Sequence, residues 1–403
     1  MQIGLRVKLS LPYLLIFTLL ISVGPVVQSK PNRNNSAPDF SRLVIVGDSL
    51  SAGVQNLSLN ENFQPNSYAA LLAQQINTPL PLPLIAAPGV PAALTLVDPG
   101  PPPVLGQEPG ESPGRIDPFL QPMNISVPNL KIDEVMHYRP DCSVDQAVGG
   151  IRLVDVYTEL VLGLPACVFG TPMYSEVEMA EALDPSFAII WIGNNDSLWA
   201  AVLGETSELT RHNVFKRHYR KLVKRVRKTG AQLLIANLPD VTDIGFLIPA
   251  ETVAALTGLD LSVLGPILGI EAGDFVTLFA FEAITHILSG EMQGPLTGDL
   301  VVTASEISEI QAATARFNRV VHRVAARYKI PVVDIRGLLS DLATNGIVVN
   351  GQLLTTNYLG GIFSLDGFHP TNIGHAITAN EFIKTINGHY NANIPLIDLE
   401  TIQ

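Results

Sequence analysis

Three short segments, far apart in the chain, combine glycine with residues that catalyse acyl transfer. They are Gly47-Asp48-Ser49, Gly193-Asn194-Asn195-Asp196 and Asp366-Gly367-Phe368-His369. A serine hydroxyl becomes a nucleophile when a histidine takes its proton, and a carboxylate can fix the tautomer of that histidine. An asparagine amide can donate a hydrogen bond to an oxyanion without adding charge. Each segment alone has an ordinary alternative as a helix cap or a turn.

The first two segments stand where strands of a parallel sheet are expected to end. Continuous apolar runs precede them at residues 43–46 and 187–192, and similar runs occur at 232–236 and 330–335. Such runs are typical of strands that are buried on both faces. Apolar residues at helical spacing lie between the last three runs, so the sequence predicts βαβ units and a parallel sheet with helices on both faces. Ligands bind at the carboxyl ends of the strands in such a sheet.

The three segments, in this order, resemble the GDSL or SGNH hydrolase superfamily. The matching residues are Gly47-Asp48-Ser49-Leu50-Ser51, Gly193-x-Asn195-Asp196 and Asp366-x-x-His369-Pro370, and the resemblance spans roughly residues 40–390. It implies an α/β fold, a three-layer α/β/α sandwich around a flavodoxin-like parallel sheet. It also implies that Ser49 is the nucleophile and an oxyanion donor through its backbone N–H. Asn195 would be a second donor, His369 the general base and Asp366 the residue that orients it.

The resemblance also implies a third oxyanion donor, a glycine on a loop after the second strand. Asn129 stands where that glycine is expected, in Asn124-Ile125-Ser126-Val127-Pro128-Asn129. Gly150 is the alternative, in the similar setting Ala147-Val148-Gly149-Gly150. Any residue except proline can supply a backbone N–H, and asparagine tolerates left-handed backbone angles better than most residues. The sequence leaves both candidates open.

The composition argues against several other classes of protein. The chain has 25 Lys+Arg against 37 Asp+Glu, a formal net charge of -12, which disfavours binding to nucleic acid. Two cysteines cannot form a structural zinc site alone, so we expect no metal, and the chemistry needs no cofactor. Cys142 and Cys167 form either a disulfide or two buried thiols, and an exported chain favours the disulfide.

The N-terminus has the layout of a secretory signal peptide. Arg6 and Lys8 precede an apolar run over residues 9–23, and small residues follow near Ser29. A retained membrane anchor is the alternative, but the run is shorter than the ~20 residues that span a bilayer. We therefore predict a signal peptide over 1–29, a linker over 30–40, a hydrolase domain over 41–395, and export to the periplasm or the medium.

Three stretches of the hydrolase domain depart from the alternation of strands and helices or carry unusual charge. Residues 78–140 are rich in proline and predict an irregular loop region. Residues 246–303 are apolar and predict a helical insertion, which is either a lid or acyl-binding wall, or additional core. The basic residues in 216–228 indicate the solvated face of an amphipathic helix, with a peripheral membrane contact as the alternative.

The sequence therefore predicts a serine ester hydrolase (a lipase, esterase or acylhydrolase) that acts on small-molecule or lipid esters. One alternative is a carbohydrate O-acetyl esterase, which would use the same triad. Another is a secreted glycan- or lipid-binding domain without activity, but such a domain would have lost Ser49, Asn195 or His369. A nucleotide-binding protein of the same fold would not place Asp48 where phosphate binds. The sequence assigns no oligomeric state.

Overall fold

The computed structural model describes residues 37–100, 103–142 and 152–402. The predicted signal peptide, residues 30–36 of the predicted linker, and Gly150 lie outside the described residues. The central sheet is parallel, and its strand order is β1 (Leu43–Gly47), β4 (Phe187–Trp191), β5 (Gln232–Ala236) and β9 (Val332–Val333). These strands coincide with the four apolar runs, because each run can be buried on both faces of a sheet.

A short segment within the proline-rich region continues the sheet beyond β1. Ile45 donates its N–H to the carbonyl of Met123 (3.0 Å), and Ile125 donates to the carbonyl of Ile45 (3.1 Å). Val127 donates to the carbonyl of Gly47 (3.2 Å). With this segment the strands take the order 2-1-3-4-5 of flavodoxin-like folds, in which the ligand site lies between the first and third strands. The predicted fold class is confirmed, but residues 78–140 are not irregular throughout.

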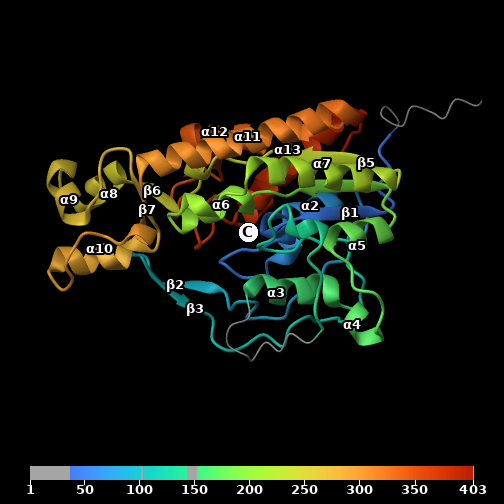
Figure 1. Ribbon diagram of the computed structural model, residues 1–403, viewed down its shortest axis with the longest axis horizontal. Helices are drawn as coiled ribbons and strands as arrows, with labels where there is room; N and C mark the ends of the chain where they lie inside the picture. Colours follow the sequence, from blue (N-terminus) through green and yellow to red (C-terminus); the bar gives the residue numbers. More distant parts are fainter. Residues whose placement is uncertain (1–36, 101–102, 143–151, 403) are drawn as a thin grey trace, which may run out of the picture.

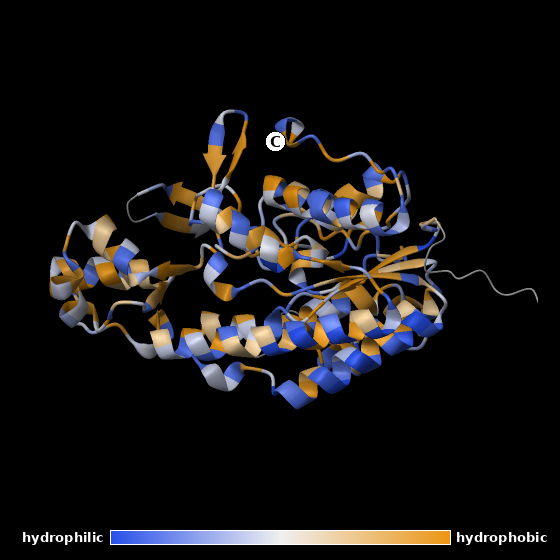
Figure 2. Cartoon of the chain, turned by 90° about the horizontal axis from the view of Figure 1, so that it is seen from above, coloured by the Kyte–Doolittle hydropathy of each residue, from blue (hydrophilic) through white to orange (hydrophobic). Residues whose placement is uncertain are grey.

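Helices cover both faces of the sheet (Figures 1 and 2). One layer contains α2 (Tyr68–Gln75) and α13 (Asn372–Tyr390), and the other contains α5 (Glu176–Ala182), α7 (His212–Lys228) and α11 (Ala304–Tyr328). Tyr68 stacks on Phe382 and meets Trp191 of β4 edge-on, with ring centroids 4.4 and 5.4 Å apart. Phe215 and Phe317 stack across the other layer at 4.2 Å. Aromatic side chains thus fill both interfaces between the sheet and its helices.

The basic helix α7 belongs to the second of these layers. Its apolar residues are buried against the core, among them Phe215, Leu222 and Val226, while most of its charged residues face outward. This arrangement is that of the amphipathic helix that the sequence predicts. The membrane contact remains an untested alternative.

Residues 246–303 form a distinct unit at one end of the molecule (Figure 1). Three antiparallel strands, β6 (Leu247–Pro249), β7 (Phe275–Thr277) and β8 (Val301–Val302), form its base. The helices α8 (Ala250–Thr257), α9 (Leu261–Leu268) and α10 (Ala280–Ser289) extend from this base. The sequence predicts a helical insertion over these residues, but residues 275–277 form a strand, as their aromatic and β-branched side chains favour.

The insertion has buried residues of its own, which continue into a second hydrophobic core. No single helix among the described residues is long and apolar enough to cross a membrane; only α8 and α9 pass that test as a pair, and they are bent by 108°. The remaining elements are α1 (Ser49–Ala52), β2 (Leu94–Asp98), β3 (Val104–Gln107), α3 (Leu153–Thr158), α4 (Ala166–Phe169), α6 (Asn195–Val202), α12 (Ile335–Asn345), β10 (Ile347–Val349) and β11 (Gln352–Leu354).

Candidate active site

Ser49 is the first residue of α1 and is separated from the end of β1 by Asp48 alone. The helix cap is Asp48, whose carboxylate accepts the N–H of Leu50 at 3.3 Å. A Cβ on Gly47 would lie 2.7 Å from the carbonyl oxygen of Trp191, so only glycine fits at this close approach of β1 to β4. Ser49 is therefore free of the capping role, and its backbone N–H lies in the first turn, where no intrahelical acceptor exists.

Asp366 and His369 lie in the loop before α13, and their side chains meet. Asp366 Oδ2 is 2.9 Å from His369 Nδ1, and Asp366 Oδ1 accepts the N–H groups of Phe368 (3.0 Å) and His369 (2.8 Å). Burial by itself would raise the pKa of Asp366. The charge on His369 and these hydrogen bonds outweigh burial, so the pKa of Asp366 is lower than its ordinary value. The ionised carboxylate holds the proton on Nδ1 and leaves Nε2 as a proton acceptor.

The position of Asp366 depends on a loop that the sequence analysis does not identify. Leu57 donates its N–H to Asp366 Oδ2 at 2.5 Å, and Asn56 exchanges hydrogen bonds with Ser364 and Leu365. Asn56 and Leu57 both have a positive φ, of 52° and 61°. Because these residues stand more than 300 positions before Asp366 in the chain, no spacing rule could have indicated their contact.

Ser49 and His369 line the same small cavity. This cavity has a volume of about 40 Å³, and Asn194, Asp240, Ile244 and Phe368 are among its other lining residues. His369 Nε2 is buried and has no hydrogen-bond partner among the described residues. A buried acceptor without a partner carries a cost of about 1–3 kcal/mol. The free nitrogen beside a serine is what a general base requires.

The two asparagines after β4 have different partners. Asn194 donates from Nδ2 to Asp48 Oδ2 at 2.8 Å and lines the cavity of Ser49. Asn195 is 2% exposed, donates from Nδ2 to the carbonyl of Leu130 at 3.1 Å, and is not among the residues that line the cavity. An amide nitrogen carries two hydrogens, so one N–H of Asn195 remains for an oxyanion.

Asn129 lies where the segment beside β1 ends, at the same edge of the sheet as Ser49. Its φ is 68°, the left-handed conformation that the glycine of this loop would adopt. The loop is tied to the start of α6 by the bond between Asn195 and Leu130 and by a 2.9 Å bond from the N–H of Ile132 to Asp196. Asn129 therefore lies on a loop held beside the residues that follow β4, whereas Gly150 lies outside the described residues.

Two buried carboxyl groups support the turn that carries Ser49. Glu176 Oε1 accepts the N–H of Gly47 at 2.6 Å, and Asp48 is held by Asn194. Burial raises the pKa of Asp48 to about 6, against the hydrogen bond from Asn194. Burial also raises the pKa of Glu176 well above its ordinary value, with a further contribution from Asp48. The sequence analysis does not single out Glu176, since nothing in its spacing connects it with Gly47.

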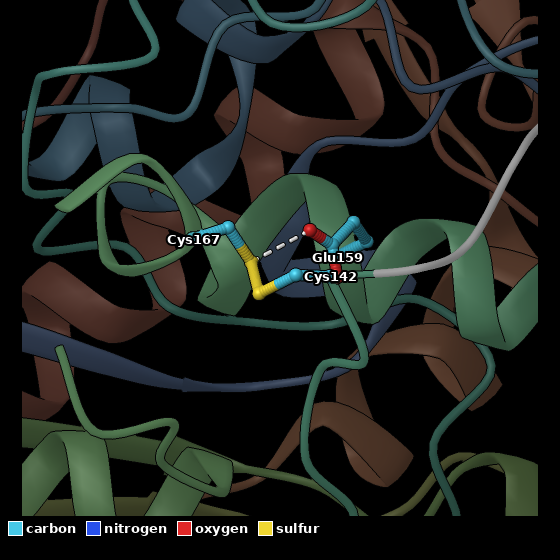
Figure 3. Close-up of side chains that lie close together, drawn as sticks. All are labelled: Cys142, Glu159 and Cys167. Atoms are coloured by element: carbon cyan, nitrogen blue, oxygen red, sulfur yellow. Dashed lines mark hydrogen bonds between the residues drawn. A yellow bond between two sulfur atoms is a disulfide. The ribbon is translucent and has the colours of Figure 1, made fainter. Parts of the chain in front are cut away.

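Cys142 and Cys167 form a disulfide (Figure 3). Glu159 Oε1 lies 2.8 Å from Cys167 Sγ, and burial raises the pKa of Glu159, with a further contribution from Asp141. The two sulfurs and this carboxylate lie within 4.8 Å of one another, close enough for a metal site. The sulfurs are bonded to each other, however, so they are not available as thiolate ligands.

Comparison with known proteins identifies the family. The model of the family described as GDSL-like Lipase/Acylhydrolase matches residues 43–382, which include the segments of Ser49, Asn195 and His369. The chain belongs to this family. It is therefore a serine ester hydrolase with a carboxylic ester as substrate.

Solved structures that resemble the chain do so only remotely. Axe2, an acetylxylan esterase from Geobacillus stearothermophilus, is 12% identical over 87% of this chain and 96% of that chain, with a TM-score of 0.40. LAE5, an alpha/beta hydrolase enzyme from the metagenome of Lake Arreo, Spain, is 14% identical over 89% and 100%, with a TM-score of 0.38. No curated protein matches the chain.

Proposed function

We propose that this enzyme hydrolyses carboxylic esters through an acyl-enzyme on Ser49. The observation that carries the proposal is the free, buried Nε2 of His369 in the cavity that Ser49 lines, with Nδ1 fixed by Asp366 at 2.9 Å. In the first step His369 accepts the proton of Ser49, and the serine oxygen attacks the ester carbonyl. His369 then donates this proton to the leaving alcohol, and water releases the acid by the reverse sequence.

The negative charge that develops on the carbonyl oxygen needs donors that are already in place. We assign this role to the N–H of Ser49, the side-chain amide of Asn195 and the N–H of Asn129. Asn195 and Asn129 belong to segments joined by hydrogen bonds, so the two donors are held together before the substrate binds. Preorganised donors of this kind are worth about 2.7–4 kcal/mol of barrier each.

Replacement of Ser49 tests the proposal. With p-nitrophenyl butyrate, the wild type should release a burst of p-nitrophenol equal to the enzyme concentration, and Ser49→Ala should release none. Ser51→Ala is the matched control, because Ser51 lies in the same turn, is fully buried and bonds to Tyr68 at 2.9 Å. Ser51→Ala should keep the burst; a burst in Ser49→Ala would refute the assignment of the nucleophile.

We further propose that the enzyme is exported after removal of residues 1–29. The Cys142–Cys167 disulfide supports this proposal, because disulfides persist in oxidising compartments and are rare in the cytosol. N-terminal sequencing of the protein recovered from the periplasm and from the medium would test both the cleavage and the destination. An intact Met1 on all of the protein would contradict the proposal.

A further inference from the structure

A second cavity, much larger than that of Ser49, lies between the insertion and the loop of residues 356–359. Its volume is about 680 Å³, against about 40 Å³ for the catalytic cavity. Pockets that bind small molecules usually measure about 300–1,000 Å³. The catalytic cavity has room only for the reacting ester group, so the rest of a substrate must lie outside it.

The chemistry of the large cavity disfavours a charged ligand. None of the described residues that line it is charged, although the chain contains 62 acidic and basic residues (25 plus 37). Ile248, Val253, Phe281 and Ile284 supply apolar surface, and the polar groups of the lining are uncharged. Burial of hydrocarbon is the favourable interaction that such a surface offers.

The large cavity adjoins the catalytic cavity. Ile244 lines both of them. Phe368 lines the catalytic cavity, and its ring centroid lies 4.5 Å from that of His369 and 5.6 Å from that of Phe246. Phe246 is buried at the base of the insertion, and its backbone packs against Gly367. The two cavities therefore share the apolar residue Ile244, and Phe368 packs against the base of the insertion.

A different hollow lies beside the oxyanion donor Asn129. It measures about 340 Å³, and its lining includes the charged residues Lys131, Glu134, Arg152 and Glu208. Its charged lining favours a polar part of the substrate. The hydrocarbon part of the substrate is therefore better matched by the uncharged cavity at the insertion. In esters of fatty acids the hydrocarbon is the acyl half of the molecule.

We propose that the insertion cavity binds the acyl chain of the substrate and gives the enzyme a preference for acyl chains of medium length. The proposal rests on the ester hydrolysis proposed above. Each methylene that moves from water into the cavity adds up to about fourfold to kcat/KM. We therefore expect p-nitrophenyl decanoate to exceed p-nitrophenyl acetate in kcat/KM by at least about tenfold.

Tryptophan substitutions that fill the cavity test the proposal. Thr252 of α8 and Thr285 of α10 line the cavity and are exposed, so their replacement leaves the core packing intact. Thr252→Trp and Thr285→Trp should each lower kcat/KM for the decanoate by about tenfold or more and leave the acetate within about twofold. Ala255→Trp is the matched control, since Ala255 is also exposed on α8 but is not a lining residue. It should change neither substrate.

Two outcomes would overturn the acyl assignment. One is a Thr252→Trp variant whose kcat/KM falls equally for the decanoate and the acetate, or does not fall for the decanoate at all. The other is a loss confined to decyl acetate, in which the hydrocarbon lies in the alcohol half. In each case hydrolysis of the acetate and the burst from Ser49 remain measurable, so failure of this proposal is distinguishable from failure of the catalytic assignment.

Discussion

The carboxyl edge of the central sheet and the insertion differ in which side chains they expose to solvent. At the sheet edge Ser49, Asn195 and His369 are 6%, 2% and 4% exposed. In the insertion, apolar side chains face outward, and Leu256 and Phe279 are 57% and 56% exposed. The cavity at the sheet edge is small and includes polar residues in its lining, whereas the cavity at the insertion is much larger and its described lining is uncharged.

This difference separates bond cleavage from substrate choice. A proton transfer and an oxyanion need groups held in fixed positions, and burial with full hydrogen bonding supplies that rigidity. Hydrocarbon needs only apolar area, so its site can be built from helices added between two strands of the fold. Changes at the sheet edge should therefore affect all ester substrates alike, and changes in the insertion should affect long chains only.

The largest expected effect is that of Asp366→Asn. The amide would no longer fix the tautomer of His369, so kcat should fall by about 10⁴-fold for the acetate and the decanoate alike. Asp240→Asn is the control, because Asp240 lines the catalytic cavity with Ser49 and His369 but accepts hydrogen bonds from Thr242 and Gln311 instead of from His369. It should cost less than about tenfold. Steady-state kinetics with the acetate and the decanoate measure this effect. A loss of kcat with only one of the two substrates would contradict the view that the sheet edge acts on all esters alike.

Asn195→Ala should have the next largest effect. Loss of one oxyanion donor should lower kcat by about 100–1,000-fold on both substrates, with KM little changed. Asn194→Ala should instead lower the free energy of unfolding, because Asp48 would lose its 2.8 Å partner. Steady-state kinetics and denaturation of the two variants show which asparagine donates to the oxyanion. A larger loss of kcat in Asn194→Ala than in Asn195→Ala would transfer the donor role to Asn194.

The smallest expected effect concerns stability and pH. Because the pKa of Glu176 is raised in the folded protein, the unfolded state loses its proton first, and stability falls as pH rises. The slope for one group is at most about 1.4 kcal/mol per pH unit. Glu176→Gln should therefore become more stable relative to the wild type as the pH rises above 4.5, the ordinary pKa of a glutamate. Urea denaturation across this range measures the difference.

Glu251→Gln is the matched control in the insertion. Glu251 lies in the first turn of α8 and accepts the N–H of Gly273 at 3.0 Å, much as Glu176 accepts that of Gly47, but Glu251 is exposed. This variant should keep the pH dependence of the wild type. If both variants changed the pH dependence of the free energy of unfolding equally, burial of Glu176 at the sheet edge would not be the cause of that dependence.

Much of the fold follows from patterns that are local in the sequence. Each apolar run forms its strand because the run itself determines that both faces must be buried. The predictions fail in part where short segments depend on distant partners. Residues 123–127 join the sheet through hydrogen bonds with β1. Residues 275–277 have side chains that favour a strand, but this three-residue strand also needs β6 and β8 as partners.

The sequence by itself indicated a serine ester hydrolase, because three segments in this order resemble the GDSL or SGNH hydrolase superfamily. The spacing from Asp366 to His369 allows the two side chains to meet, but taken alone it does not identify an active site. Only the tertiary structure decided what surrounds these groups. Contacts such as that of Leu57 with Asp366, the left-handed backbone of Asn129, and the cavity in the insertion join residues far apart in the chain. Packing determines such contacts, and no local pattern encodes them.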